Sequence, residues 1–170
     1  RNQKVNSVKR FSDHVEVNGE SFDFVIIATH ANAALEILDD ASAEEREKLA
    51  DFGYSSNHTV LHKDGSKLPT PNKARASWNY KMDCKDTQNK VVVSYWMNLL
   101  MRLKGNTDYV VTLNADVDTD KRIATMQYEH PVFTVEALEA AKFIKNAGGP
   151  RLAFAGAHLG WGFHEDGARS

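Results

Sequence analysis

The stretch that decides the fold is Ala155-Gly156-Ala157-His158-Leu159-Gly160-Trp161-Gly162-Phe163-His164-Glu165-Asp166-Gly167, near the end of the 170-residue sequence. Its glycines lie among aromatic and charged residues, and the apolar run 152–155 before them is short enough for a buried strand. A strand that enters a glycine-rich loop can bring backbone N–H groups close to a ligand, because glycine allows positive φ and adds no Cβ. A helix that begins near Glu165 would offer further N–H groups to an anion. On the glycines alone, a turn between packed elements is the simpler interpretation.

The whole stretch resembles the closing motif of flavin-dependent amine-oxidase-like proteins, in particular a bacterial family described as predicted NAD/FAD-binding oxidoreductases. A similar sequence forms the flavoprotein half of plant cyclopropane-fatty-acid synthases. The family motif reads close to F-x-G-A-x-x-G-x-G-F-H-E-D-G, which this chain matches from Phe154 to Gly167. The resemblance implies FAD as the cofactor. It also implies that FAD contacts come from Gly156, Ala157, Gly162, Phe163, His164, Glu165, Asp166 and Gly167.

The bulk composition excludes several classes of protein. The chain has 21 basic and 23 acidic residues and a net charge of −2, so no basic field indicates nucleic acid. No apolar run approaches the ~18 residues of a membrane-spanning helix. The one cysteine, Cys84, cannot form an internal disulfide, which favours a reducing compartment. We therefore expect a cytoplasmic protein.

Two features indicate a portion of a longer protein. The sequence opens on Arg1 without a methionine, and it contains no G-x-G-x-x-G turn. The resembling family carries that phosphate-binding turn near its N-terminus. We therefore expect a C-terminal portion whose partner is a missing N-terminal dinucleotide-binding part.

Residues 4–28 predict a β meander. Val15 and Val17 alternate with a polar residue, and Asn18-Gly19 is the strongest short-range signal for a hairpin turn. The third strand is expected to end in the continuous apolar run 24–28, which predicts burial on both faces.

That run leads into Ala28-Thr29-His30. In the resembling family, D-x-V-I-x-A-T-H returns the chain to the cofactor domain, which implies that Ala28 and Thr29 lie near FAD. Since the glycine-rich stretch is expected at the same cofactor, we predict that the two segments are neighbours in the folded chain. The residues alone also allow a strand end at which Thr29 caps the next helix. His30 fits a packed or surface histidine better than a catalytic base.

The rest of the sequence predicts helices, then a strand-rich region, then a returning helix. Two helices are expected over 31–52, and Ser42-x-x-Glu45 is a capping box at the start of the second. From residue 54 the period is two, with strands expected near 59–62, 74–80, 91–97, 109–113 and 123–128. A helix that Thr134 caps follows.

We therefore predict an α+β fold, a mostly antiparallel mixed sheet with flanking helices, similar to the substrate domain of a flavin amine-oxidase-like protein, plus partial cofactor-domain strands. The expected divisions are a partial FAD-domain meander over 1–30, a substrate domain over 31–149, and an FAD-contacting strand and loop over 150–170.

Four aromatic residues on the predicted strands are ambiguous: Trp78, Tyr80, Tyr95 and Trp96. Aromatic residues on paired strands most simply pack across the strands. The resemblance implies instead that they line a substrate pocket that faces the flavin. Alternation places Trp78 and Tyr80 on one face, but it does not say which face meets the cofactor.

Other catalytic patterns are weak. His58 and His62 would lie about 13 Å apart on a strand, too far for one metal ion, so we expect no metal site. The chain has no G-x-S-x-G elbow, and no histidine neighbours Cys84. Glu165 and Asp166 would stabilise the first turn of a helix without any chemistry.

The sequence therefore predicts part of an FAD-dependent oxidoreductase, amine-oxidase-like, that moves a hydride from a substrate to the flavin and is inactive without the rest of the protein. The substrate is a small or lipid-like molecule, and no catalytic residue is assigned. The alternative is a non-catalytic binding or regulatory module that acts with a lipid-modifying methyltransferase.

Overall fold

The computed structural model describes residues 2–82 and 91–170, and these form two compact units. The first unit combines Arg1–Ser55 with His130–Ser170, and the second is Ser56–Glu129. Helices and strands are mixed, and the largest sheet has five strands, which confirms the predicted α+β class.

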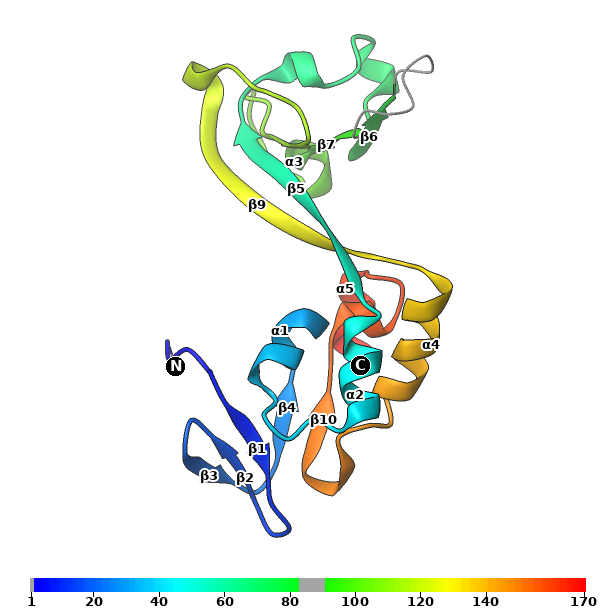
Figure 1. Cartoon of the computed structure of the whole chain (residues 1–170). Coiled ribbons are helices and arrows are strands. Elements are labelled where there is room, and N and C mark those ends of the chain that lie inside the picture. Colours follow the sequence, from blue (N-terminus) through cyan, green and yellow to red (C-terminus); the bar gives the residue numbers. More distant parts are fainter. Residues whose placement is uncertain (1, 83–90) are drawn as a thin grey trace. The chain divides into compact units, whose positions relative to one another are not determined.

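The first unit opens with the predicted meander, the three-stranded sheet β1 (Val8–Arg10), β2 (Val15–Val17) and β3 (Glu20–Phe22). Figure 1 shows it in blue. Asn18 and Gly19 join β2 to β3 with φ values of 51° and 82°. Two central residues with positive φ match the right-handed twist of the flanking strands, so the hairpin prediction is confirmed.

The third strand does not run on to residue 28, as the sequence predicted. The chain bends at Asp23, and β4 (Val25–Ile27) pairs in parallel with β10 (Leu152–Phe154) in a separate two-stranded sheet. Ile27 is buried, whereas Ile26 is 62% exposed, so the predicted burial on both faces is wrong. Successive residues of a strand point to opposite faces, and the described residues cover only the face of Ile27.

Helices α1 (Ala31–Ile37), α2 (Ala43–Ala50) and α4 (Val135–Ile144) contribute buried residues to the same core as β4 and β10. The capping box at α2 is confirmed, since Ser42 Oγ accepts from Glu45 N–H at 3.1 Å and Glu45 Oε2 accepts from Ser42 N–H at 2.8 Å. Thr134 caps α4 by accepting from Ala137 N–H at 3.1 Å, as expected.

A buried ion cluster joins distant segments of the first unit. Arg10 donates from Nη1 and Nη2 to the two carboxylate oxygens of Glu45, each at 2.7 Å, and from Nε to Asp40 Oδ2 at 2.8 Å. Glu45 Oε1 also accepts from Gly148 N–H at 3.2 Å. The Arg10 guanidinium is the main reason that the pKa of Glu45 falls from 4.5 to about 2. The cluster therefore links β1, α2 and the turn before β10.

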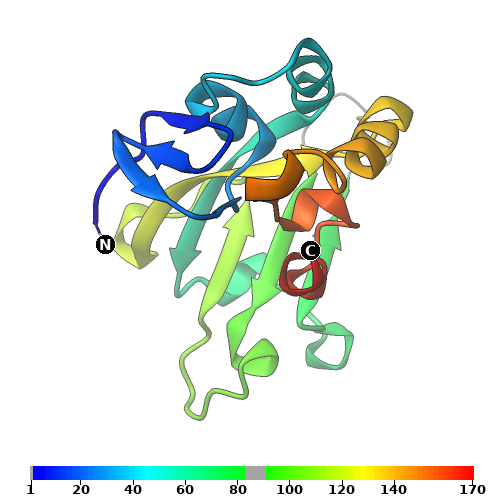
Figure 2. The same ribbon diagram turned by 90° about the horizontal axis from the view of Figure 1, so that it is seen from below.

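The second unit contains most of the five-stranded sheet, in the order β6-β7-β8-β5-β9. Its strands are β5 (Gly53–His62), β6 (Trp78–Lys81), β7 (Val92–Trp96), β8 (Val110–Leu113) and β9 (Arg122–Val132). Figure 2 shows these strands in colours from teal (β5) through green to yellow (β9). β6 begins four residues later than predicted, because Asn72–Ala74 form a 3-10 turn.

Short helical turns complete the described chain. They are α3 (Met97–Leu100), α5 (His164–Arg169), and the 3-10 turns Gly65–Lys67, Asn72–Ala74, Thr119–Lys121, Gly149–Arg151 and Ala157–Leu159. Within the described residues, no helix has the length and apolar character to cross a membrane.

The two units are divided at other positions than the sequence predicted. Helices α1, α2 and α4 were expected with the strand-rich region, but their apolar faces pack into the core of the first unit. The boundaries of the units fall within β5 and β9 rather than near residues 30 and 150. The cofactor and substrate roles of the two regions stay predictions.

Candidate functional site

The parallel pair β4 and β10 brings together the two segments that the sequence singled out. Ile27 lies opposite Phe154, and Ala155 N–H donates to Ile27 O at 2.9 Å. Residues 28–30 therefore leave the sheet beside the glycine-rich loop 155–163, which confirms the predicted adjacency. The carboxyl ends of parallel strands are where ligands of open α/β sheets bind. Figure 1 shows the two strands side by side, β4 in blue and β10 in orange.

The glycine-rich loop is tightly folded. Gly156 has φ 151° and Gly162 has φ 85°. A Cβ on Gly156 would lie 2.6 Å from the ring of His158, and a Cβ on Gly162 would lie 3.1 Å from the ring of Phe133. Side chains at these positions would therefore force the loop to rearrange.

Asp166 fixes the shape of this loop from α5. Its Oδ2 accepts from the N–H groups of Trp161 at 3.1 Å and Phe163 at 3.0 Å. Glu165 is bound instead to Arg169 at 2.7 Å on the surface of α5. Of the two predicted acids, only Asp166 holds the loop directly.

His158 is a feature that the sequence analysis missed. It is a buried residue of the loop itself, with its ring edge-on to Phe52 at 5.1 Å between centroids. Burial is the main cause, and His30 a smaller one, of a fall in the pKa of His158 from 6.5 to about 4. His158 is therefore neutral at pH 7. The sequence feature that could have indicated it is its place two residues after Gly156, within the glycine-rich stretch.

His30 and Tyr54 support the end of β4. Their rings stack at 4.5 Å, and Tyr54 Oη accepts from Ala31 N–H at 2.8 Å. Thr29 does not cap α1, although the sequence allowed that interpretation. The N-cap residue is His30 without a side-chain cap bond, and the Thr29 hydroxyl donates to His30 O at 3.1 Å. Tyr54, rather than Thr29, binds the first N–H group of the helix.

The predicted cofactor residues lie together in the first unit, at the ends of β4 and β10 and on α5. They are Ala28, Thr29, Gly156, Ala157, Gly162, Phe163, His164, Glu165, Asp166 and Gly167. Phe163 and Trp161 are 65% and 66% exposed, so the loop presents aromatic surface.

The four predicted substrate aromatics do not share one face of the second unit. Trp78 lies opposite Tyr95 across β6 and β7, and their rings stack at 6.2 Å with an interplanar angle of 4°. Tyr80 shares the face of Trp78, and both are 61% exposed. Trp96 points to the other face, where its Nε1 donates to Asp108 at 2.9 Å.

Two other sequence hypotheses concern metals and thiols. No group of three His, Cys, Asp or Glu side chains that could hold a metal occurs in 2–82 or 91–170. Cys84 lies outside the described residues.

No protein-family model and no curated protein matches the chain. Solved structures do. A CLA-producing fatty acid isomerase from P. acnes has a TM-score of 0.58 at 13% identity over 97% of this chain and 44% of its own. A putrescine oxidase redesigned in cofactor binding has a TM-score of 0.60 at 12% identity, over 97% of this chain and 45% of its own.

Cyclohexylamine oxidase from Brevibacterium oxydans IH-35A is similar with a TM-score of 0.58 at 10% identity, over 96% of this chain and 45% of its own. The chain therefore spans less than half the length of each of these proteins. The comparison with cyclopropane-fatty-acid synthases stays a prediction. The likeness establishes the fold: this chain shares its α+β arrangement, almost from end to end, with two amine oxidases and a fatty acid isomerase.

Proposed function

We propose that this chain is the C-terminal portion of an FAD-dependent oxidoreductase of the amine-oxidase type. The observation that carries the proposal is the parallel pair β4 and β10, whose carboxyl ends bring Ala28-Thr29 beside the glycine-rich loop. The fold that the chain shares with putrescine oxidase and cyclohexylamine oxidase supports it.

The residues present fit a part of a flavin site. The loop at Gly156 and Gly162 is compact, and Asp166 keeps its backbone in place. The ring of His158, a residue of the loop, packs on Phe52 and is neutral at pH 7, so it adds no charge there. We propose that Ala28, Thr29 and the backbone of the loop hold the isoalloxazine end of FAD, with Phe163 as an apolar contact. Bound FAD supplies the acceptor for a hydride taken from the substrate.

The second unit would provide the substrate contacts. We propose Trp78, Tyr80 and Tyr95 for this role, because their rings line one exposed face of β6 and β7. Trp96 is left out of the proposal, since Asp108 binds its indole on the opposite face.

The rest of the flavin site is proposed to come from an N-terminal dinucleotide-binding part. The pyrophosphate of such cofactors lies on a glycine-rich turn and a helix N-terminus, and this sequence has no G-x-G-x-x-G. Without those contacts, the remaining interactions must still offset several kcal/mol of lost translational and rotational freedom. We therefore expect the 170-residue chain alone to bind FAD weakly.

The test is the flavin absorbance per protein of the chain and of a version extended by the proposed N-terminal part. We expect the chain to purify colourless and the extended protein to purify yellow. In the extended protein, Gly162→Val should lower the flavin content, because its side chain would meet Phe133. Gly19→Val is the matched control, since Gly19 has a similar φ of 82° but a Cβ there would meet no atom within 4 Å.

Three outcomes would contradict the proposal. Stoichiometric FAD on the chain alone would show that no further part is needed. An unchanged flavin content in Gly162→Val would remove the loop from the cofactor site. An extended protein that binds no flavin would favour the alternative, a binding or regulatory module that acts with a lipid-modifying methyltransferase.

A further inference from the structure

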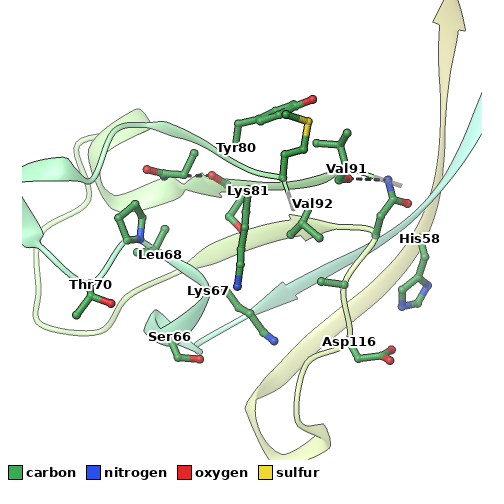
Figure 3. A pocket seen from close by; sticks show the side chains of 16 residues that line it. His58, Ser66, Lys67, Leu68, Thr70, Tyr80, Lys81, Val91, Val92 and Asp116 are labelled. Atoms are coloured by element: carbon green, nitrogen blue, oxygen red, sulfur yellow. Dashed lines mark hydrogen bonds between the residues drawn. The ribbon is translucent and has the colours of Figure 1, made fainter. Parts of the chain in front are cut away.

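A pocket of about 1080 Å³ lies within the second unit, on the sheet face opposite the Trp78–Tyr95 stack. Figure 3 shows its lining. Asn79 and Lys81 of β6 pair with Ser94 and Val92 of β7, and all four residues line this pocket. Because residues opposite each other in an antiparallel pair share a face, these side chains form its floor.

A chain of hydrogen bonds lies on the same face of the sheet and ends at Ser94 in this floor. Asp64 N–H donates to His62 Nδ1 at 3.0 Å, so that nitrogen carries no proton. The proton of the neutral ring is therefore on Nε2, which donates to Thr112 Oγ1 at 2.8 Å. Thr112 Oγ1 also lies 2.9 Å from Ser94 Oγ. His62, Thr112 and Ser94 are all buried.

Ser94 and Thr112 can each donate in this contact. Thr112 Oγ1 accepts from His62 with one lone pair, and a hydroxyl oxygen has two, so either the Thr112 or the Ser94 hydrogen lies between the two oxygens. Ser94 lines the pocket, so its hydroxyl is the end of the hydrogen-bond chain that a ligand can reach. Burial lowers the pKa of His62, which keeps its ring neutral at pH 7.

The charged side chains of the pocket are Lys67, Lys81 and Asp116, two cations against one anion. In Figure 3 the side chains of Lys67 and Lys81 extend into the same part of the pocket. Neither lysine forms an ion pair with any other residue in the described part of the chain. The apolar part of the wall includes Leu68, Val91 and Val92, and uncharged polar residues such as Asn79 and Asn114 complete it.

We propose that this pocket binds an oxyanion carried on an apolar body, a carboxylate or a phosphate monoester. The oxyanion accepts hydrogen bonds from Lys67 and Lys81 and contacts the Ser94 hydroxyl, and the apolar body packs on Leu68, Val91 and Val92. Charged oxygens form the stronger hydrogen bonds in proteins, and two lysines without an ion pair in the described part of the chain favour such a ligand. The proposal does not depend on the flavin.

Calorimetric titration of the chain with four probes of equal chain length tests it: octanoate, octyl phosphate, octanol and octylammonium. We expect octanoate or octyl phosphate to bind, and octanol and octylammonium to bind at least about tenfold more weakly. Tighter binding of octyl phosphate than of octanoate would identify a phosphate ester as the ligand class, and the reverse order a carboxylate. Equal binding of octanol and both anions would overturn the proposal.

Variants locate the binding site. Lys67→Ala and Lys81→Ala should each weaken binding of the anion about tenfold or more. Lys73→Ala, at an exposed lysine of the same unit outside the pocket, should leave it unchanged. Loss of binding in Lys73→Ala to the same degree would show a diffuse charge effect, and no change in the first two variants would refute the site.

Thr112 has a positioning role in this proposal. Thr112→Val removes the hydroxyl that shares a hydrogen bond with Ser94 Oγ, whereas Thr112→Ser keeps it. We expect Thr112→Ser to retain anion binding and Thr112→Val to lose about tenfold in affinity while octanol binding stays the same. Equal anion affinities of the two variants would show that the hydrogen-bond chain does not act on the ligand. Circular dichroism on each variant confirms that it is folded.

Discussion

Replacing Glu45 by glutamine should cost the first unit a large part of its stability. The Glu45 side chain is 6% exposed, and it accepts from Arg10 twice, from Ser42 N–H and from Gly148 N–H. Glutamine keeps the shape but removes the charge and puts an N–H₂ group where a donor was bound. Breaking one member of a buried ion pair typically costs about 3–5 kcal/mol.

The pKa of Glu45 gives an independent magnitude. Its fall from 4.5 to about 2 corresponds to about 3 kcal/mol of stabilisation at pH 7. A carboxyl group whose pKa is lowered in the folded state stabilises fully above its unfolded pKa. The contribution is lost as the pH falls from 4.5 through 2, and about 1 kcal/mol of it is left at pH 3.

The assay is urea unfolding at pH 7 and pH 3, followed by helical circular dichroism. This signal reports the first unit, because α1, α2, α4 and α5 all belong to it. We expect Glu45→Gln to unfold with about 3 kcal/mol less free energy at pH 7 and to differ less from the original chain at pH 3. Glu47→Gln, at a 69% exposed side chain of the same helix, is the control and should change less than about 0.5 kcal/mol. A loss below about 1 kcal/mol in Glu45→Gln at pH 7 would refute the reasoning.

Two further predictions concern single residues of the first unit. The pKa of His158 is lowered from 6.5 to about 4 in the folded chain, so its contribution is full above pH 6.5 and is lost as the pH falls toward 4. His158→Gln should therefore flatten the thermal stability profile over that range, and exposed His164→Gln should leave the slope intact. A Cβ on Gly148 would lie 2.4 Å from Leu152 O. Gly148→Ala should therefore lower the free energy of unfolding, measured by urea titration, by more than about 2 kcal/mol. Gly149→Ala, with positive φ but open space, should cost about 1 kcal/mol, and equal losses at both glycines would contradict the steric argument.

Local signals in the sequence predicted local structure well. The Asn18-Gly19 turn and the Ser42–Glu45 capping box are both present, because each depends on residues within a few positions of one another. The adjacency of 28–30 and 155–163 was also predicted, but from resemblance rather than from periodicity. Neither segment by itself indicates that the other lies beside it.

The features that the sequence did not reveal depend on distant residues. Glu45 was predicted only as a cap residue, because nothing near it in the sequence indicates Arg10 or Gly148. The apolar run 24–28 predicted full burial, yet Ile26 is exposed because one face of a two-stranded sheet is covered and the other is not. Similarly, the hydrogen-bond chain of Asp64, His62, Thr112 and Ser94 joins residues that are distant in the sequence.

The interrupted first unit has a consequence for the order of events during synthesis. Its core needs both β4 and β10, but the whole of Ser56–Glu129 lies between them in the chain. A ribosome therefore releases every residue of the second unit before α4 and β10 exist to close the first. The chain makes this pairing late, since contacts between distant residues form slowly and expose apolar strands until they form. Until then, residues 8–52 expose apolar surface that the finished core buries. During this interval the chain offers a chaperone its largest exposed apolar surface.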